Sequence, residues 1–174
     1  MRGLRLNVRF VVVSCPQTLV VDLVSELTVL CNAITDFCTV ESCPVMKAGE
    51  CYRYAWPDPT PTDCTASTLL PAPKYLELLI GWVETQLSAY DNSAQIKSDS
   101  FRTNAKVFCR RLFRVYAHLF AEHAGDIQPI QIHLEYSLYH FLLFMHEFEL
   151  QVSAKEIDPI QRLIDSFGVS HFFN

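Results

Sequence analysis

The stretch that decides the fold reads Ser100-Phe-Arg-Thr-Asn-Ala-Lys-Val-Phe-Cys-Arg-Arg-Leu-Phe-Arg-Val-Tyr-Ala-His118-Leu-Phe-Ala-Glu-His123. Its apolar residues recur at alternating steps of four and three, which places them in one stripe along an α-helix. The stripe consists of Phe101, Ala105, Phe108, Leu112, Val115 and Leu119. Because a helix with one apolar stripe must cover that stripe, the segment predicts an amphipathic helix packed within a larger helical fold.

Four further segments of the chain show the same kind of pattern, with apolar residues every three or four positions. These segments are residues 18–37, 73–87, 130–148 and 158–167. Pro73 suits the first position of its helix, because a proline there forfeits no helical hydrogen bond. In the last segment we expect Asp158 as the N-cap, Pro159 at the first helical position and Gly168 as the stop. Together the five segments predict an all-α, single-domain helical bundle.

The segment 38–71 breaks the helical pattern. It contains Pro44, Pro57, Pro59, Pro61 and Pro71, and its one strand-like run is Cys51-Tyr-Arg-Tyr-Ala-Trp56. The composition predicts a long Pro-rich loop or a short hairpin. A loop of this length is uncommon inside a compact domain unless something anchors it, and a metal ion at its start would do so.

Charge and cysteine content limit the classes of protein to consider. The 174-residue chain carries 19 acidic and 14 basic residues, a formal net charge of −5. That sign argues against a protein that coats nucleic acid through a general basic surface. Seven cysteines, an odd number at irregular spacing, favour a reducing compartment over a disulfide framework. Since no long apolar run is present, we expect no membrane insertion and a cytoplasmic protein, with the nucleus as an additional compartment.

Two short motifs supply four potential metal ligands. Four residues separate Cys38 from Cys43, and four separate His118 from His123. Two thiolates and two imidazoles at such spacings suit a structural zinc site. The 74 residues between the two pairs match no common zinc finger. From spacing alone, buried cysteines and an ordinary helix end are an equally good interpretation.

The two histidines impose a condition on the helix that carries them. Residues five apart on a continuous helix point about 140° away from each other. If both bind one ion, the helix must therefore end between His118 and His123. Gly125 is a suitable stop just beyond this point.

The same helix carries a cationic ridge. Its members are Arg102, Lys106, Arg110 and Arg114, which step by four, with Arg111 beside them. At about 100° per residue, this ridge lies roughly opposite the apolar stripe. Such a run is commonly a solvated charged face. Because the helix supplies almost no acidic neighbours, a site for phosphate or carboxylate is the alternative.

The chain shows no signature of a catalytic site. The patterns G-x-x-x-x-G-K-[ST], G-x-G-x-x-G and G-x-S-x-G are absent from it. Seven cysteines and six histidines allow many Cys–His pairs, but no local pattern singles out a nucleophile. We therefore expect no enzymatic activity, and a zinc-stabilised helical nucleic-acid-binding module stands as an alternative function.

Five motifs in order along the chain resemble the Mob family of Mps-one-binder kinase activators, in particular its founding Mob-one-like branch. They are Phe37-Cys-Thr-Val-Glu-Ser-Cys-Pro-Val-Met46, Tyr52-Arg-Tyr-Ala-Trp56, Ala72-Pro-Lys-Tyr75, Arg111-Leu-Phe-Arg-Val-Tyr-Ala-His118 and Phe144-Met-His-Glu-Phe148. The resemblance runs from Leu19 to Gly168. It indicates a Mob/phocein-like domain over 18–170, preceded by a divergent N-terminal segment, 1–17.

The resemblance implies a set of site residues and partners. One structural zinc ion would be held by Cys38, Cys43, His118 and His123. A basic phosphopeptide-binding patch would consist of Arg110, Arg111 and Arg114. The implied protein is a non-catalytic adaptor and co-activator that binds the N-terminal regulatory region of NDR/LATS-type AGC kinases in Hippo or mitotic-exit type signalling. A phosphorylated upstream kinase or scaffold peptide would recruit it, and no nucleic acid is an expected partner.

The chain departs from the family pattern in two places. Relatives carry an acidic stretch upstream of the first helix that meets the basic kinase segment, whereas residues 1–13 here are basic and apolar. Of the acidic positions expected there, Asp22 is the one that matches. The Pro- and Thr-rich insertion from Pro57 to Pro71 is longer than usual, and the sequence assigns it no role.

Overall fold

The computed structural model describes residues 16–57, 67–88, 99–150 and 152–173. Its α-helices are α1 (Pro16–Asn32), α2 (Ala72–Ser88), α4 (Asp99–Glu122), α5 (Gln131–Glu147), α6 (Ala154–Ile157) and α7 (Gln161–Ser166). Short 3-10 helices are η1 (Gln128–Ile130), η2 (Asp158–Ile160) and η3 (Ser170–Phe173). The strands are β1 (Lys47–Ala48), β2 (Tyr52–Arg53), β3 (Ala55–Pro57) and β4 (Ser67–Leu69). The fold is therefore mostly helical with two minor sheets.

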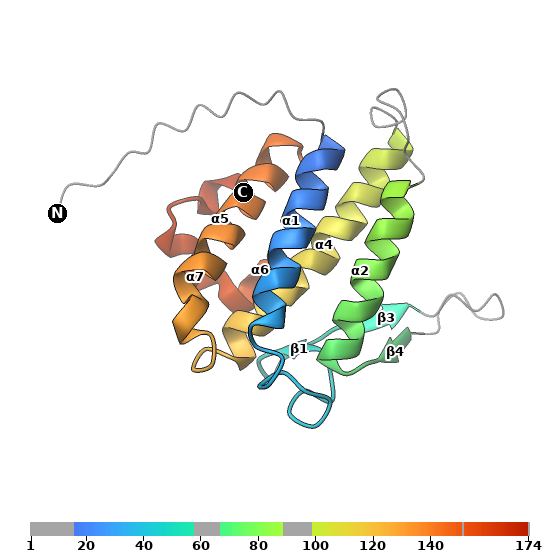
Figure 1. The fold of residues 1–174 in the computed structure, drawn as a ribbon. Coiled ribbons are helices and arrows are strands. Elements are labelled where there is room, and N and C mark those ends of the chain that lie inside the picture. The colour runs from blue at the N-terminus through green and yellow to red at the C-terminus, as the bar shows by residue number, and fades with distance from the viewer. Residues whose placement is uncertain (1–15, 58–66, 89–98, 151, 174) are drawn as a thin grey trace.

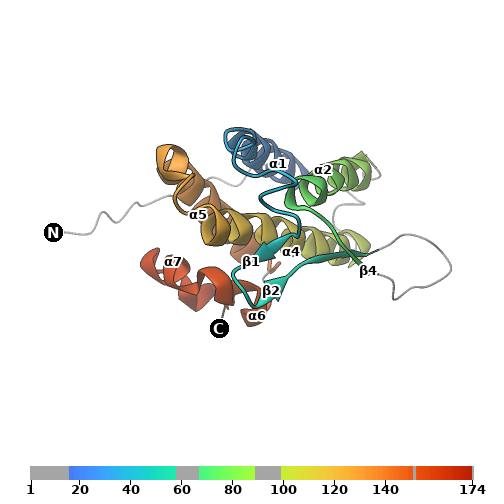
Figure 2. The same ribbon diagram turned by 90° about the horizontal axis from the view of Figure 1, so that it is seen from below.

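Helix α4 lies in the middle of the molecule. Figure 2 shows α1 and α2 on one side of it and the C-terminal elements α6 and α7 on the other, with α5 alongside. Its predicted stripe is buried at Ala105, Phe108 and Leu112, and Phe113 next to the stripe is also fully buried. Segment 100–123 thus forms the centre of the core, as its apolar stripe predicts.

Helix α5 packs against α1 and adds the second half of the core (Figure 1). Leu134, Leu138 and Phe141 on α5 are all fully buried. The Phe141 ring stacks on Tyr116 of α4, with 5.5 Å between the ring centroids. The Tyr116 hydroxyl lies 2.8 Å from Ser137 Oγ, so each of these two buried hydroxyl groups has a hydrogen-bond partner.

The predicted loop contains two strand pairs. Strands β1 and β2 are antiparallel, with Ala48 opposite Tyr52, and β1 lies against α4. Strands β3 and β4 are also antiparallel, with Trp56 opposite Thr68. The prediction of an all-α chain with a long loop or one short hairpin is therefore corrected: this segment forms two antiparallel strand pairs. The insertion begins in β3 and returns through β4, while 58–66 lie outside the described residues.

Two predicted helix boundaries are wrong. The first helix ends at Asn32 rather than Phe37, and residues 33–37 continue as turns. The amides of Ala33, Ile34 and Phe37 still bond to carbonyls three or four residues back. Asp158 is not an N-cap, because its φ of −45° and ψ of −42° are helical and its side chain makes no capping bond. Gly168 does end the last helix, with a φ of +72° that favours glycine.

Among the helices of the described residues, none is both long enough and apolar enough to cross a membrane. The predicted N-terminal segment, 1–17, lies outside the described residues except for its last two positions.

Candidate metal centre and basic face

Four potential metal ligands come together at one end of α4. Cys38 and Cys43 lie in the turns that follow α1, and His118 lies on the last turns of α4. His123 is the first residue after that helix, which ends at Glu122. Four ligand atoms, one from each residue, lie within 4.8 Å of one another. The structure thus brings together all four predicted ligands from two segments far apart in the sequence.

The distances within the cluster suit a tetrahedral ion. Cys38 Sγ lies 3.4 Å from His118 Nε2, and Cys43 Sγ lies 3.3 Å from His123 Nε2. Zinc bonds of about 2.3 Å to sulfur and about 2.0 Å to nitrogen separate the two bound atoms by about 3.5 Å in a tetrahedron. The residues present therefore fit zinc by donor type and by spacing. A metal ion held there would supply a structural cross-link.

Each imidazole is oriented by a second hydrogen bond. His118 donates its Nδ1–H to the carbonyl of Lys47 at 2.8 Å, and His123 donates its Nδ1–H to Asp126 at 3.0 Å. Both bonds leave the Nε2 lone pair directed at the thiols. Metal-ligating histidines are typically held in this way, which fixes the tautomer and the ring orientation.

Burial also shifts the pKa of two of the four groups, Cys38 and His118. The pKa of the Cys38 thiol is raised to about 12, first by burial and then by the neighbouring Cys43. Burial lowers the pKa of His118, which favours the neutral imidazole that a metal needs. Ionisation of the Cys38 thiol is therefore unfavourable by itself, because its sulfur is buried and lies close to that of Cys43. A divalent cation between them would remove that penalty.

The β1–β2 hairpin is tied to the same end of α4. Glu122 accepts a hydrogen bond from the backbone amide of Gly49 at 2.6 Å and pairs with Lys47 Nζ at 3.1 Å. Since the Lys47 carbonyl also holds His118, the hairpin and the ligand cluster form one connected unit.

The helix ends where the ligand geometry requires, between His118 and His123. The change of direction is small, because the His123 amide still bonds to the Leu119 carbonyl four residues back. The two rings lie 5.1 Å apart at 75°. The two imidazoles therefore approach each other largely through the orientation of their side chains. The end of the helix contributes less than the spacing of the histidines predicts.

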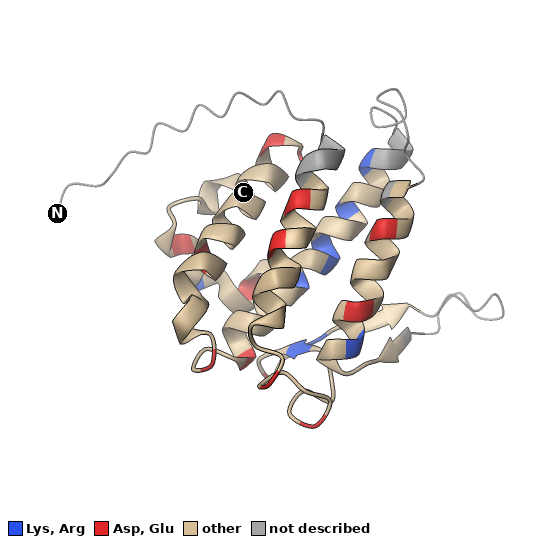
Figure 3. Cartoon of the chain, viewed as in Figure 1, with Lys and Arg blue, Asp and Glu red and all other residues tan. Residues whose placement is uncertain are grey.

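The cationic ridge is less uniform than its spacing suggests. Figure 3 shows Lys and Arg concentrated on α4, between the acidic positions of α1 and α2. Arg110 is exposed, and no described carboxylate pairs with it. The Arg111 guanidinium lies 4.4 Å from the ring centroids of both Trp56 and Trp82. Burial lowers the pKa of Arg111, yet two cation–π contacts stabilise its charge there.

Arg114 is paired with an acidic residue from another element. Its Nη2 lies 2.7 Å from Glu156 Oε1 and its Nε lies 3.1 Å from Glu156 Oε2, so the contact is bidentate. The guanidinium also lies 5.1 Å from the Tyr54 ring. Arg102 forms an ion pair with Glu149 at the other end of the helix, through one contact between exposed side chains. Tertiary contacts thus neutralise part of a ridge that has no acidic partners within its own helix.

We call Arg110, Arg111 and Arg114, together with the side chains that contact them, the basic face. Its members Trp56, Trp82 and Glu156 were not predicted from the sequence. The two tryptophans are aromatic residues on half-buried positions, a common arrangement that gives no sign of an arginine between them. Glu156 lies 42 residues after its partner Arg114, and no local spacing connects the two.

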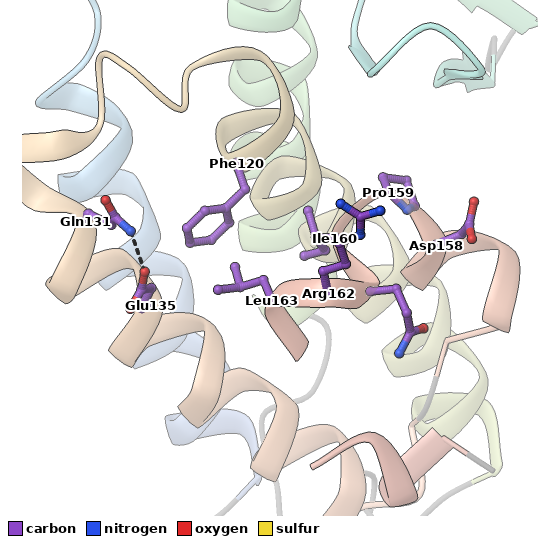
Figure 4. Close-up of a pocket in the computed structure, with 9 residues that line it drawn as sticks. Phe120, Gln131, Glu135, Asp158, Pro159, Ile160, Arg162 and Leu163 are labelled. Carbon is purple, nitrogen blue, oxygen red and sulfur yellow. Dashed lines mark hydrogen bonds between the residues drawn. The ribbon is translucent and has the colours of Figure 1, made fainter. Parts of the chain in front are cut away.

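One cleft of about 430 Å³ lies where the end of α4 meets α5, η2 and α7. Figure 4 shows Phe120 and Leu163 facing this space, with the Gln131–Glu135 hydrogen bond of 2.7 Å at its edge. The cleft includes none of the predicted metal or phosphopeptide residues. Its lining contains no cysteine, serine or histidine.

The fold and the cluster define a class: a helical-bundle protein whose candidate metal centre ties a hairpin-containing loop to the central helix. The chain belongs to the Mob1/phocein family, whose model matches residues 17–160. This finding confirms the resemblance that the five motifs indicate.

Similar proteins cover most of the chain. "MOB kinase activator-like 2A" of Arabidopsis thaliana is 39% identical over 155 residues, which is 84% of this chain and 69% of that protein. "MOB kinase activator-like 1A" of the same plant is 38% identical over 152 residues, again 84% and 69%. "MOB kinase activator-like 1 homolog A" of Dictyostelium discoideum is 36% identical over 151 residues, 83% of this chain and 70% of that protein.

Proposed function

We propose that this protein is a non-catalytic adaptor and co-activator that binds the N-terminal regulatory region of an NDR/LATS-type AGC kinase. The observation that carries this proposal is its membership of a family whose relatives are named kinase activators. Its signalling context would be of the Hippo or mitotic-exit type. It would act in the cytoplasm, with the nucleus as an additional compartment. The kinase segment would bind an acidic surface on α1, and a phosphopeptide would bind the basic face.

The Cys38, Cys43, His118 and His123 cluster would hold one structural zinc ion. Its role would be mechanical: the ion would join the loop after α1 to the end of α4. The hairpin tied to Glu122 would be fixed with it. The loop that carries Tyr54 and Trp56 would then be held against α4, where these two aromatic residues contact Arg114 and Arg111.

The exposed face of α1 is the best candidate surface for the kinase segment. Every charged residue on α1 is acidic: Asp22, which is exposed, and Glu26, which is half-buried. Val21 and Val29 are 46% and 68% exposed on the same helix. Acidic and apolar side chains together suit a basic amphipathic helix, the kind of segment that docks through one apolar face.

Replacing Asp22 by lysine should weaken binding to a purified N-terminal segment of an NDR/LATS-type kinase by about threefold to tenfold at low salt. The reason is that the change converts attraction of a basic segment into repulsion. Isothermal titration calorimetry measures the difference, and added salt should reduce it. The matched control is Glu84→Lys, an exposed acidic position on α2. Failure of the unchanged protein to bind any such kinase segment would refute the kinase-adaptor proposal.

The basic face would bind the phosphate of a phosphothreonine or phosphoserine peptide through Arg110, Arg111 and Arg114. Arg110 is exposed, and the other two are held in place by aromatic and acidic neighbours. A guanidinium that is already ordered loses less entropy when it binds an anion, and its hydrogen bonds to phosphate are charge-assisted.

Arg110→Ala should lower the affinity for a phosphothreonine peptide by about tenfold to 150-fold, the equivalent of one charge-assisted bond of about 1.5 to 3 kcal/mol. Fluorescence anisotropy with the phosphorylated and unphosphorylated forms of one peptide measures this. Arg102→Ala is the matched control, because Arg102 lies on the same helix but pairs with Glu149. Equal affinity of the unchanged protein for both peptide forms would reject the phosphopeptide site.

The alternative of a nucleic-acid-binding module predicts a different outcome. It requires tight, salt-sensitive binding to an RNA or DNA oligonucleotide that competes with the peptide. The formal net charge of −5 opposes such binding, because a nucleic-acid backbone is itself anionic.

A further inference from the structure

The ion pair between Arg114 and Glu156 differs from the other arginine pair on α4. The Arg114 and Glu156 side chains are only 19% and 13% exposed, whereas those of Arg102 and Glu149 are 49% and 73% exposed. Glu156 belongs to α6, a short helix that packs against α4. The charge of Glu156 is therefore little screened by solvent, and it lies directly on the basic face.

The contact with Glu156 also determines which N–H donors of Arg114 are occupied. Glu156 occupies the edge formed by Nε and Nη2, two of the guanidinium's nitrogen donors. A guanidinium carries five N–H donors, and the bidentate contact uses two of them, which leaves three for other acceptors. An anion that reaches Arg114 thus meets a carboxylate on the far edge of the same group.

We propose that Glu156 is the affinity-setting residue of the basic face: an internal anion that weakens the binding of phosphate to Arg110, Arg111 and Arg114. The inference rests on the proposed phosphopeptide site and goes beyond it, because it assigns a role to a residue of the opposite charge. Three arginines and one glutamate leave a formal charge of +2, where the three arginines alone would have +3. The face then binds phosphate reversibly and holds singly charged carboxylates poorly.

The electrostatic argument makes a quantitative prediction. The interaction energy between Glu156 and a bound anion is proportional to the charge of that anion. A phosphate ester carries about −1.5 to −2 at pH 7 and a glutamate side chain carries −1. Removing the Glu156 charge should therefore strengthen both kinds of binding. The fold-change in affinity for a phosphate should be about the square of the fold-change for a carboxylate.

The test compares three peptides that differ at one position, which holds phosphothreonine, glutamate or threonine. Glu156→Gln should raise the affinity for the phosphothreonine peptide about tenfold and for the glutamate peptide about threefold. The affinity for the threonine peptide should stay within about twofold. Glu149→Gln removes the carboxylate of the exposed pair and should leave all three affinities unchanged.

Two further variants separate charge from folding. Glu156→Asp keeps the negative charge and should keep the low affinity, whereas Glu156→Met removes the charge at similar length and should raise it as Glu156→Gln does. Thermal unfolding of each variant shows that it is folded. If the unchanged protein prefers the phosphorylated peptide but neutral variants bind it equally well or more weakly, Glu156 positions Arg114 and the inference is wrong. If the unchanged protein shows no such preference, the proposed phosphopeptide function fails instead.

Discussion

Protein that carries Cys38→Ser together with His123→Ala should lose its metal and most of its stability. Structural zinc contributes on the order of 10 kcal/mol to folding, which is comparable to the whole stability of a typical domain, about 5 to 15 kcal/mol. Elemental analysis of protein purified without added zinc should find close to one equivalent in the unchanged chain and almost none in the variant. Circular dichroism should show the variant partly or wholly unfolded at 25 °C.

The size of this effect follows from what surrounds the ligands. His118 and His123 are 2% and 4% exposed, and Cys43 is 6% exposed. If their shared ion were removed, buried polar groups would be left with few partners, and such groups destabilise a folded state. The hairpin at Lys47 would also lose part of its attachment, because its carbonyl holds the ring of His118.

A matched pair of substitutions tests that the effect belongs to the cluster. Cys51 and His133 are exposed and lie outside the ligand set. Cys51→Ser with His133→Ala should keep one equivalent of zinc and the original melting temperature. Full metal occupancy in the Cys38→Ser, His123→Ala protein would refute the ligand assignment, whatever its stability.

Phe141→Ala should produce the largest destabilisation expected away from the metal cluster, about 3 to 5 kcal/mol. Phe141 is fully buried, and its ring stacks on Tyr116 at the interface between α4 and α5. Truncation would remove apolar burial and leave a cavity that the two helices cannot close without shifting. The melting temperature should fall by about 6 to 20 °C, measured by calorimetry.

Ile132→Ala is the control for this substitution. Ile132 lies on the same helix, but its side chain is 73% exposed. Its truncation should change stability by less than about 0.5 kcal/mol. If the two variants were equally stable, the α4–α5 interface would not be the centre of the core.

The helical part of the fold could be predicted from local pattern because helix geometry repeats over a few residues. The stripes in 73–87, 100–123 and 130–148 each correspond to an observed helix, α2, α4 and α5. The errors lie at boundaries that distant contacts decide. Asp158 accepts a hydrogen bond from the hydroxyl of Tyr52, 106 residues away, and its backbone is already helical after α6.

The candidate sites also depend partly on local sequence and partly on tertiary contacts. The sequence alone determined the two ligand pairs and the spacing of the arginines, because each lies within one or a few helical turns, and their order along the chain indicated the family. Tertiary structure alone decided that thiols and imidazoles 80 residues apart meet at one point. It also placed Arg111 between two tryptophans and gave Arg114 a partly buried acidic partner. Local periodicity follows from backbone geometry, whereas these contacts depend on how α1, α6 and the hairpin pack around α4.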